Sequence, residues 1–289
     1  MSKIFMLEKK MSLLKSSLIL SFALTTTISP LAMAQTNVTM TSFRDWCTQE
    51  TSLPLATQKT INAVVGALKV ENCLQAAEII PKVFAINISS KGISDLRPLS
   101  SLISITELTL YDNEISDISP LKSMTNLKKL ILGHNQISDL SPLNSLTNLE
   151  KLYLSDNKIE DLKPLSSFKN LRTLYINQNN ISDLTPLENL TNLEELYAKD
   201  NQINDLKPLD DLTNLTELYL DNNKIFDLTP LTKLKKLEEL SLNNNNITNS
   251  NINSLWDLDS LQELYLHNNP VARQFCPNNK KALCFIGNR

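Results

Sequence analysis

Leucine and isoleucine recur through most of the chain in a pattern that returns at a constant interval, so that Asn113, Asn135 and Asn157 mark the same point of three consecutive units. Residues 149–165 show one unit, which reads Leu-Glu-Lys-Leu-Tyr-Leu-Ser-Asp-Asn-Lys-Ile-Glu-Asp-Leu-Lys-Pro-Leu. Two leucines of each unit stand two positions apart, as Leu152 and Leu154 do, and this spacing points both side chains to one face of an extended strand. The pattern therefore predicts one short strand per unit, stacked on the strands of neighbouring units as a parallel sheet.

Three further residue types, asparagine, aspartate and proline, recur in the units at the same spacing. The asparagine follows the strand, where a buried amide can pair with backbone groups that have no partner in the sheet. The aspartate can cap a short 3-10 turn, and the proline fixes φ and removes a backbone donor on the return path. These columns are interpreted as structural. They are Asn113, Asn135, Asn157, Asn179, Asn201, Asn223 and Asn245; Asp95, Asp117, Asp139, Asp161, Asp183, Asp205 and Asp227; and Pro98, Pro120, Pro142, Pro164, Pro186, Pro208 and Pro230.

A single unit cannot bury its own apolar side chains, so each unit needs a neighbour on either side. Ile159, Leu162, Leu165 and Phe168 fill the interior opposite the strand leucines. Each fully buried Leu or Ile contributes roughly 1.5–3 kcal/mol. A fixed period between about 20 and 50 residues is typical of solenoids. The sequence therefore predicts an α/β repeat fold, a solenoid of about nine turns over residues 83–271.

The repeat resembles that of bacterial internalins, whose units read L-x-x-L-x-L-x-x-N-x-I and match residues 105–247 nearly position by position. The resemblance implies a right-handed leucine-rich-repeat solenoid with a concave parallel sheet and a protein-binding concave surface. Two departures stand out. Ala198 occupies a core leucine position, which predicts a small void or a repacked neighbour. The interval from Asn245 to Asn269 is longer than the other asparagine intervals, which predicts a two-residue bulge near 249–256.

A solenoid must cover the core at both open ends. Residues 35–82 are interpreted as a helical N-terminal cap, because Ser52 before Pro54 signals a helix start and apolar residues follow at helical spacing. Phe43 and Trp46 are expected to cover the first core layer. Residues 272–289 are interpreted as a short C-terminal cap or tail.

The four cysteines fall at the two ends of the repeat array. About nine turns at the sheet spacing separate the ends by roughly 40 Å, whereas a disulfide needs Cα atoms within about 7 Å. The predicted pairs are therefore Cys47–Cys73 and Cys276–Cys284. Neither pair has the spacing of a zinc site, so no metal is expected.

Residues 1–34 have the order of a secretory signal peptide: four lysines, an apolar run over 18–24, and the small-residue site Ala32-Met33-Ala34. The alternative, a membrane anchor, is disfavoured because the run is shorter than the about 20 residues that a bilayer needs. We expect a secreted or periplasmic protein without membrane insertion. Loss of the four lysines and one glutamate of this segment changes the formal charge from −3 to −6, which argues against nucleic acid as a partner.

Catalytic candidates are few. His134 and His267 are the two histidines and lie about six turns apart, so they cannot share a site. The carboxylates recur with the repeat, which is typical of exposed lanes rather than of an acid/base pair. Asp112, Asp156 and Asp200 lack the ligand density of a calcium loop. We expect no enzyme activity and no cofactor.

The residue between the two strand leucines points out of the core, and tyrosine is frequent there. The column reads Thr109, Ile131, Tyr153, Tyr175, Tyr197, Tyr219, Ser241 and Tyr265, with Tyr111 two residues beyond Thr109. One interpretation is an aromatic ladder that stabilises the sheet by about 0.2–1 kcal/mol per pair. The other is a binding stripe, because tyrosine offers a large contact area, a polar tip and few rotors. The binding candidates are Tyr111, Tyr153, Tyr175, Tyr197, Tyr219 and Tyr265.

A second outward column lies beside the first, and the charge of its side chains changes along the array. It begins with Glu107, Lys129, Lys151 and Thr173 and continues with Glu195, Glu217, Glu239 and Glu263. The four later glutamates are further binding candidates, since they would orient a partner with a basic patch; ordinary surface charge is the alternative. The leading hypothesis is a secreted, monomeric protein-binding module that uses its concave face. Carbohydrate binding and a structural role in the envelope are the rivals.

Overall fold

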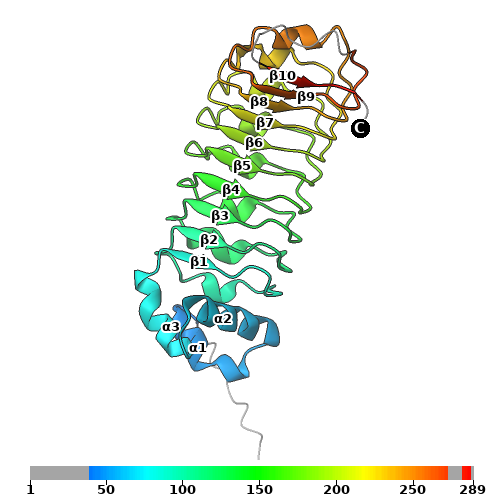
Figure 1. The fold of residues 1–289 in the computed structure, drawn as a ribbon. Coiled ribbons are helices and arrows are strands. Elements are labelled where there is room, and N and C mark those ends of the chain that lie inside the picture. Colours follow the sequence, from blue (N-terminus) through cyan, green and yellow to red (C-terminus); the bar gives the residue numbers. More distant parts are fainter. Residues whose placement is uncertain (1–38, 273–281, 288–289) are drawn as a thin grey trace, which may run out of the picture. The chain divides into compact units, whose positions relative to one another are not determined.

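The computed structural model describes residues 39–272 and 282–287. Ten short strands form one parallel sheet in strict chain order (Figure 1). This arrangement confirms the predicted leucine-rich-repeat solenoid. The strands are β1 (Ala85–Asn87), β2 (Glu107–Thr109), β3 (Lys129–Ile131), β4 (Lys151–Tyr153), β5 (Thr173–Tyr175), β6 (Glu195–Tyr197), β7 (Glu217–Tyr219), β8 (Glu239–Ser241), β9 (Glu263–Tyr265) and β10 (Leu283–Phe285).

The sheet register follows the sequence repeat. Each central leucine faces its equivalent in the next strand, as Leu174 faces Leu196, and both are fully buried. Between β8 and β9 the chain is longer than in the other turns, yet Leu240 still faces Leu264. The two extra residues are taken up outside the sheet, around the 3-10 helix Ile252–Leu255, within the segment where the bulge was predicted. Ala198 is fully buried at its core position.

Between β1 and β9, the return path of each turn carries one 3-10 helix. The aspartate lies one residue before the N-cap, not at it as a helix cap would, but its carboxylate accepts the first backbone N–H of the helix: Asp161 Oδ1, for example, accepts the N–H of Lys163 at 2.7 Å. The proline stands at the first or second helical position, where its missing N–H leaves no hydrogen bond unmade. The return helices with this aspartate and proline are Arg97–Leu99, Ser119–Ser123, Ser141–Leu143, Lys163–Leu165, Thr185–Leu187, Lys207–Leu209 and Thr229–Lys233; the eighth, Ile252–Leu255, has neither.

The asparagine column joins each turn to the one before it. Asn179 Oδ1 accepts the N–H of Ile159 at 3.0 Å, and Asn179 Nδ2 donates to the carbonyls of Leu154 and Ile176 at 3.1 and 3.2 Å. The amide therefore pairs with backbone groups of two adjacent turns, as the sequence predicted.

Three α-helices pack at the β1 end of the array: α1 (Phe43–Thr48), α2 (Leu55–Leu68) and α3 (Cys73–Ile79) (Figure 1). Phe43 and Trp46 are buried in the core that continues into the solenoid, as expected. Ser52 does not cap α2; it ends a preceding 3-10 turn, and Pro54 stands at the N-cap. The helix is held to the first turn by Thr60, whose hydroxyl donates to the Asp95 carbonyl at 2.6 Å.

Cys47 and Cys73 form the predicted disulfide, which joins α1 to the start of α3 with Cα atoms 5.4 Å apart. Cys276 and the expected signal peptide lie outside the described residues, so the second pairing and the cleavage site stay predictions. The limits of the caps also stay predictions. No helix in the described part of the chain is long and apolar enough to cross a membrane.

The C-terminal tail differs from expectation, because it adds the strand β10 to the sheet. Leu283, Cys284 and Phe285 pair with Glu263, Leu264 and Tyr265, and the chain between these partners is shorter than in the repeats. Cys284 takes the inward leucine position, and Phe285 takes the outward tyrosine position. The strand β10 was not predicted from the sequence, because neither its spacing from β9 nor its inward-facing residue matches the repeat.

Candidate functional site

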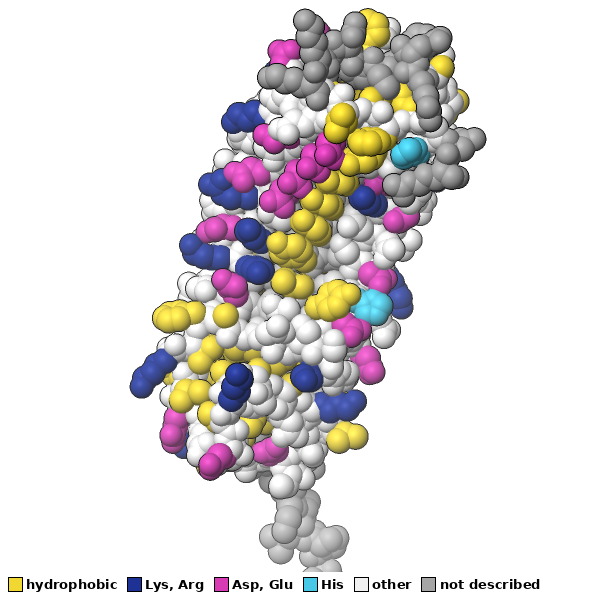
Figure 2. All heavy atoms as spheres, viewed as in Figure 1, with side chains coloured by type: hydrophobic (Ala, Val, Ile, Leu, Met, Phe, Trp, Pro, Cys, Tyr) yellow, Lys and Arg dark blue, Asp and Glu magenta, His cyan; other side chains and the backbone are white. Residues whose placement is uncertain are grey.

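The rings of four tyrosines stack one after another on the solvent-facing side of the sheet, away from the core. Because the strands are in register, each ring lies over the next one: the centroids of Tyr153 and Tyr175 are 4.8 Å apart, those of Tyr175 and Tyr197 are 4.0 Å apart, and those of Tyr197 and Tyr219 are 4.4 Å apart. Figure 2 shows this apolar stripe crossing the face, with an acidic row beside it. We call Tyr153, Tyr175, Tyr197, Tyr219 and Tyr265 the tyrosine stripe.

The stack is interrupted once and then resumes. Ser241 stands in register between Tyr219 and Tyr265 and breaks the row of rings. Beyond it, Tyr265 stacks on Phe285 with centroids 4.8 Å apart. The sequence did not identify Phe285 as a member of this face, because that assignment depends on the strand β10.

Tyr111 does not belong to the stripe. It follows β2 rather than lying within it, is half exposed, and stacks on His134 at a centroid distance of 6.0 Å. His134 Nε2 lies 3.3 Å from Asp112 Oδ1, and His134 Nδ1 contacts Asp156. The hydrogen bond to Asp156 raises the pKa of His134. The structure therefore separates one predicted binding tyrosine from the other five.

The four predicted binding glutamates form a row directly beside the stripe, which we call the acidic row: Glu195, Glu217, Glu239 and Glu263. They face one another in register on consecutive strands. Burial, together with the neighbouring Glu217 carboxylate, raises the pKa of Glu195.

Hydrogen bonds tie the stripe to the row. The hydroxyls of Tyr197 and Tyr219 donate to the glutamates of the next strand, Glu217 and Glu239. The hydroxyl of Tyr265 donates to Glu263 on its own strand. The tyrosines and carboxylates thus form one connected surface rather than two independent columns.

On the other side of the stripe lies a group that the sequence did not single out. Lys199 Nζ is 2.9 Å from Asp221 Oδ2 and 4.5 Å from the ring centroid of Tyr219. Asp221 is buried and also accepts hydrogen bonds from the Ser241 hydroxyl and, at 2.9 Å, from the Asn243 N–H. Lys199, Asp221 and Asn243 occupy the position two residues after the tyrosine column, and that position was the available signal.

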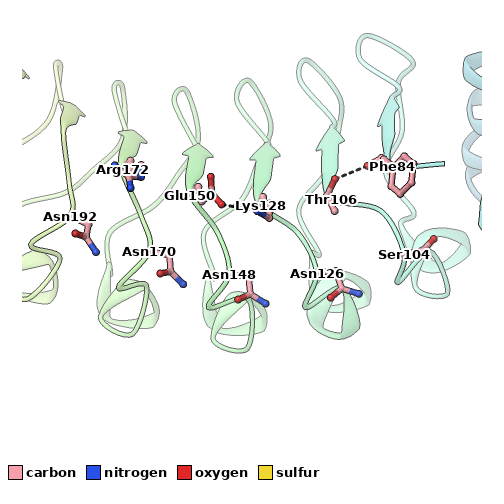
Figure 3. Close-up of a pocket in the computed structure, with 10 residues that line it drawn as sticks. All are labelled: Phe84, Ser104, Thr106, Asn126, Lys128, Asn148, Glu150, Asn170, Arg172 and Asn192. Carbon is pink, nitrogen blue, oxygen red and sulfur yellow. Dashed lines mark hydrogen bonds and ion pairs between the residues drawn. The ribbon is translucent and has the colours of Figure 1, made fainter. Parts of the chain in front are cut away.

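A separate side groove of about 580 Å³ runs along the entry to the strands (Figure 3). Asparagine side chains of successive turns line this groove. Asn148 Nδ2, for example, donates to the Thr125 carbonyl at 2.9 Å. Lys128 and Glu150 pair across it at 3.0 Å. These contacts join successive turns along the groove, which lies apart from the tyrosine stripe and the acidic row.

Comparison with known proteins shows the family of this chain. The leucine-rich-repeat family described as "Leucine Rich repeats (2 copies)" matches residues 125–167, 147–189, 169–210 and 191–236, and a single-repeat description matches 236–258. The solved structure of internalin C2 from Listeria monocytogenes is 34% identical, with a TM-score of 0.68, and the match covers 72% of this chain and 92% of that one. The chain belongs to the internalin-like leucine-rich-repeat family.

Two further structures show how widely the fold recurs. An internalin (inlF) from Listeria monocytogenes is 25% identical with a TM-score of 0.51, and the match covers 81% of this internalin-like chain and 93% of that one. The ectodomain of an Arabidopsis thaliana receptor kinase, 24% identical with a TM-score of 0.57, shares the fold over 67% of this chain and 25% of its own. No curated protein matches by sequence. Leucine-rich-repeat solenoids are typically protein–protein interaction modules, and members of this family are generally non-enzymatic.

The stacked tyrosines of this internalin-like protein should resist ionisation. Burial, the largest cause in each case, raises the pKa of the hydroxyls of Tyr153, Tyr175, Tyr197 and Tyr219, and the hydrogen bonds to Glu217 and Glu239 raise the last two further. An unfolded tyrosine ionises near pH 10. As the pH rises, the unfolded chain therefore loses its phenolic protons before the folded chain does. The protonated tyrosines contribute their full stability below about pH 10, and this contribution declines as the pH rises toward the pKa values of the folded state.

A spectrophotometric titration checks this prediction. The tyrosinate absorbance of the native protein should rise at higher pH than that of the urea-unfolded chain, with a step where alkaline unfolding occurs. The Tyr197→Phe variant should lose part of the difference. Coincident curves for native and unfolded protein would contradict the prediction.

Proposed function

We propose that this chain is a secreted module that binds a protein partner through the tyrosine stripe and the acidic row. The observation that carries the proposal is the juxtaposition itself: five aromatic side chains and four carboxylates share one face of a rigid sheet. Rigid aromatic side chains contribute strongly to protein interfaces because few rotors are frozen on binding.

The charge of this face indicates the partner. Four glutamates in direct register repel one another, so a cationic surface placed over them relieves that repulsion. Lys129 and Lys151 lie at the corresponding positions of β3 and β4. A partner with a basic patch would therefore be oriented toward the C-terminal half of the array.

Stacking gives the tyrosines a structural role as well. Their rings contact one another across the strands, as in a ladder that stabilises the sheet. The two roles are compatible, because the ring edges and hydroxyls remain on the outer surface. Carbohydrate binding is less favoured, since a sugar ring stacks on an aromatic face, and these faces are largely covered by neighbouring rings.

Photo-crosslinking from two matched lysine positions tests the proposal. A photoreactive residue in place of Lys151 lies on the sheet face beside the stripe, whereas one in place of Lys122 lies on a return helix; both lysines are exposed. In cells that export the full chain, the first position should trap a protein, and the second should trap none.

Variants then test whether the trapped protein is bound by the tyrosine stripe. Combined replacement of Tyr175, Tyr197 and Tyr219 with alanine should abolish the crosslink, because each such residue at the centre of an interface is worth about 2 kcal/mol or more. Phe226→Ala, which removes an exposed aromatic away from the sheet, should leave it intact. Equal trapping from Lys122, or undiminished trapping by the triple variant, would refute binding at this face.

A further inference from the structure

Two columns of the repeat line the side groove of about 580 Å³ (Figure 3). One column stands directly before the strands β1 to β5 and consists of Phe84, Thr106, Lys128, Glu150 and Arg172. The other stands three residues before the strands β2 to β6 and consists of Ser104, Asn126, Asn148, Asn170 and Asn192. Because both columns recur once per turn, the groove presents similar side chains at a regular interval along the solenoid.

The four asparagines of the second column are held in one orientation. Each side chain donates one N–H to a backbone carbonyl of the preceding turn, at distances of 2.9, 2.9, 3.1 and 2.8 Å from Asn126 to Asn192. Figure 3 shows these side chains at the same point of successive turns. A ligand therefore meets a preorganised row of amides, which lowers the entropic cost of binding.

Each of these amides retains hydrogen-bonding capacity. A side-chain amide has two donor hydrogens and an oxygen with two lone pairs, and the bond to the preceding turn uses one donor only. All four residues are exposed, and none of their amide oxygens accepts a hydrogen bond from the described part of the chain. One turn beyond the groove, in contrast, the Asn214 oxygen accepts from Lys236 Nζ at 2.8 Å. The row of available amides therefore ends at Asn192.

The charged residues of the groove neutralise one another. Lys128 Nζ lies 3.0 Å from Glu150 Oε1, and Arg172 pairs with Glu194. Each cation thus has a carboxylate of the next turn beside it, and neither sign dominates. The groove therefore suits an uncharged ligand better than an anionic or a cationic polymer.

An aromatic ring stands at the first turn of the groove (Figure 3). Phe84 is 71% exposed, and among the described residues no other ring stacks on it, unlike the rings of the tyrosine stripe. Its carbonyl accepts the hydroxyl of Thr106, the next residue of the column, at 3.2 Å. The ring offers an open apolar platform at the end of the row of amides.

We propose that the side groove binds an extended, uncharged polysaccharide chain, with Phe84 stacking on one sugar ring and the asparagine amides pairing with the hydroxyls of the following rings. A hydroxyl both donates and accepts, and so does each available amide. Neighbouring hydroxyls of one ring can therefore satisfy the oxygen and the second N–H of one asparagine. Because the groove lies apart from the tyrosine stripe, this inference goes beyond the proposed function and does not depend on it.

The spacing of the groove favours a glycan over a peptide. Successive turns stand about 4.8 Å apart at the sheet, which is close to the advance of one ring in an extended β-linked glycan. Such a chain stays in register with the amides over four turns. An extended peptide advances about 3.3 Å per residue and places every second side chain on one side, about 6.6 Å apart. A peptide would therefore lose register with the amides within two turns.

Cellopentaose and chitopentaose are suitable probes, because both are extended, β-linked and uncharged. Nuclear magnetic resonance of the full chain, labelled with nitrogen-15, is the readout. The side-chain amide signals of Asn148 and Asn170 should shift saturably with at least one probe, while that of Asn180, an exposed asparagine outside the groove, should not. Maltopentaose has the same sugar rings as cellopentaose, but its α linkages curve the chain. It should bind at least about tenfold more weakly, because two or more hydrogen bonds are lost. N-acetyl-pentaserine amide serves as the uncharged peptide for comparison.

One pair of variants tests the aromatic platform. Phe84→Ala removes the exposed ring and should weaken pentasaccharide binding several-fold without lowering the thermal unfolding temperature. Phe226→Ala removes a ring that is 55% exposed outside the groove, and it should bind as the unaltered protein does.

A second pair tests the amides. The double variant Asn148→Ala and Asn170→Ala removes the two central asparagines and should abolish saturable shifts of the Asn192 amide. The matched double variant Asn180→Ala and Asn189→Ala removes two exposed asparagines outside the groove and should retain them. If the first double variant fails to fold, Phe84→Ala decides the test.

The outcomes separate this inference from the proposed function. No saturable shift with either β-linked probe, equal binding of maltopentaose or of the serine peptide, or undiminished binding by Phe84→Ala or by the central asparagine double variant would each overturn the glycan assignment. The triple tyrosine variant should bind the pentasaccharide normally. If it loses both the sugar and the crosslink, the sugar binds at the stripe and this inference is wrong. If it keeps both, only the proposed function fails.

Discussion

Replacing Asn179 with alanine is expected to lower the free energy of unfolding by about 3–5 kcal/mol, which is the sum of several unsatisfied buried polar groups. The substitution removes the acceptor of the Ile159 N–H and the donor to the Leu154 and Ile176 carbonyls. Water cannot replace the amide, because Asn179 is only 8% exposed. Urea unfolding followed by circular dichroism measures the loss.

Asn180 provides the matched control. It is the next residue and is exposed, so Asn180→Ala should change the free energy of unfolding by less than about 0.5 kcal/mol, as is usual at the surface. A similar small effect at Asn179 would show that the asparagine column is not needed to join successive turns.

The repeat made most of the fold predictable because one physical requirement recurs at every turn. A strand leucine such as Leu174 must be buried by its neighbours, and its equivalents at the same spacing must therefore be stacked. The same reasoning placed the tyrosines on the outer face, since side chains alternate along a strand. The pairing of Cys47 with Cys73 followed from distance alone.

The rest depended on contacts that a periodic pattern does not encode. The strand β10 breaks the spacing and places Cys284 where the repeat has leucine. Tyr111 shares a face with the stripe by residue count, but it stands two residues after the tyrosine column and stacks on His134 of the next turn. The repeat offers histidine at this position only in that one turn, so the contact is not periodic.

The electrostatic organisation of the site was also only half predictable. The acidic row was visible as a column of glutamates, whereas its hydrogen bonds to Tyr197 and Tyr219 depend on how side chains lean across the strands. The ion pair of Lys199 with Asp221 arises between neighbouring turns at one level only. Such contacts are singular in an otherwise repetitive chain, so the repeat pattern does not predict them.

Replacing Phe168 with alanine is expected to destabilise the protein by about 3–5 kcal/mol, because a large apolar side chain is removed and a cavity remains. Phe168 is the largest of the fully buried side chains, at a position that is leucine in most other turns. Since a solenoid turn contacts only its two neighbours, no distant segment can move in to fill the space. Urea unfolding of the full chain measures the effect.

Two substitutions make this test specific. Phe226 is 55% exposed, so Phe226→Ala removes the same side chain and should cost less than about 0.5 kcal/mol. Phe168→Leu installs the residue of neighbouring turns and should cost less than about 1.5 kcal/mol, provided that the core repacks as volume-tolerant cores do. If Phe168→Leu is as costly as Phe168→Ala, this turn is shaped around its aromatic ring, and the core layers of the solenoid are not interchangeable.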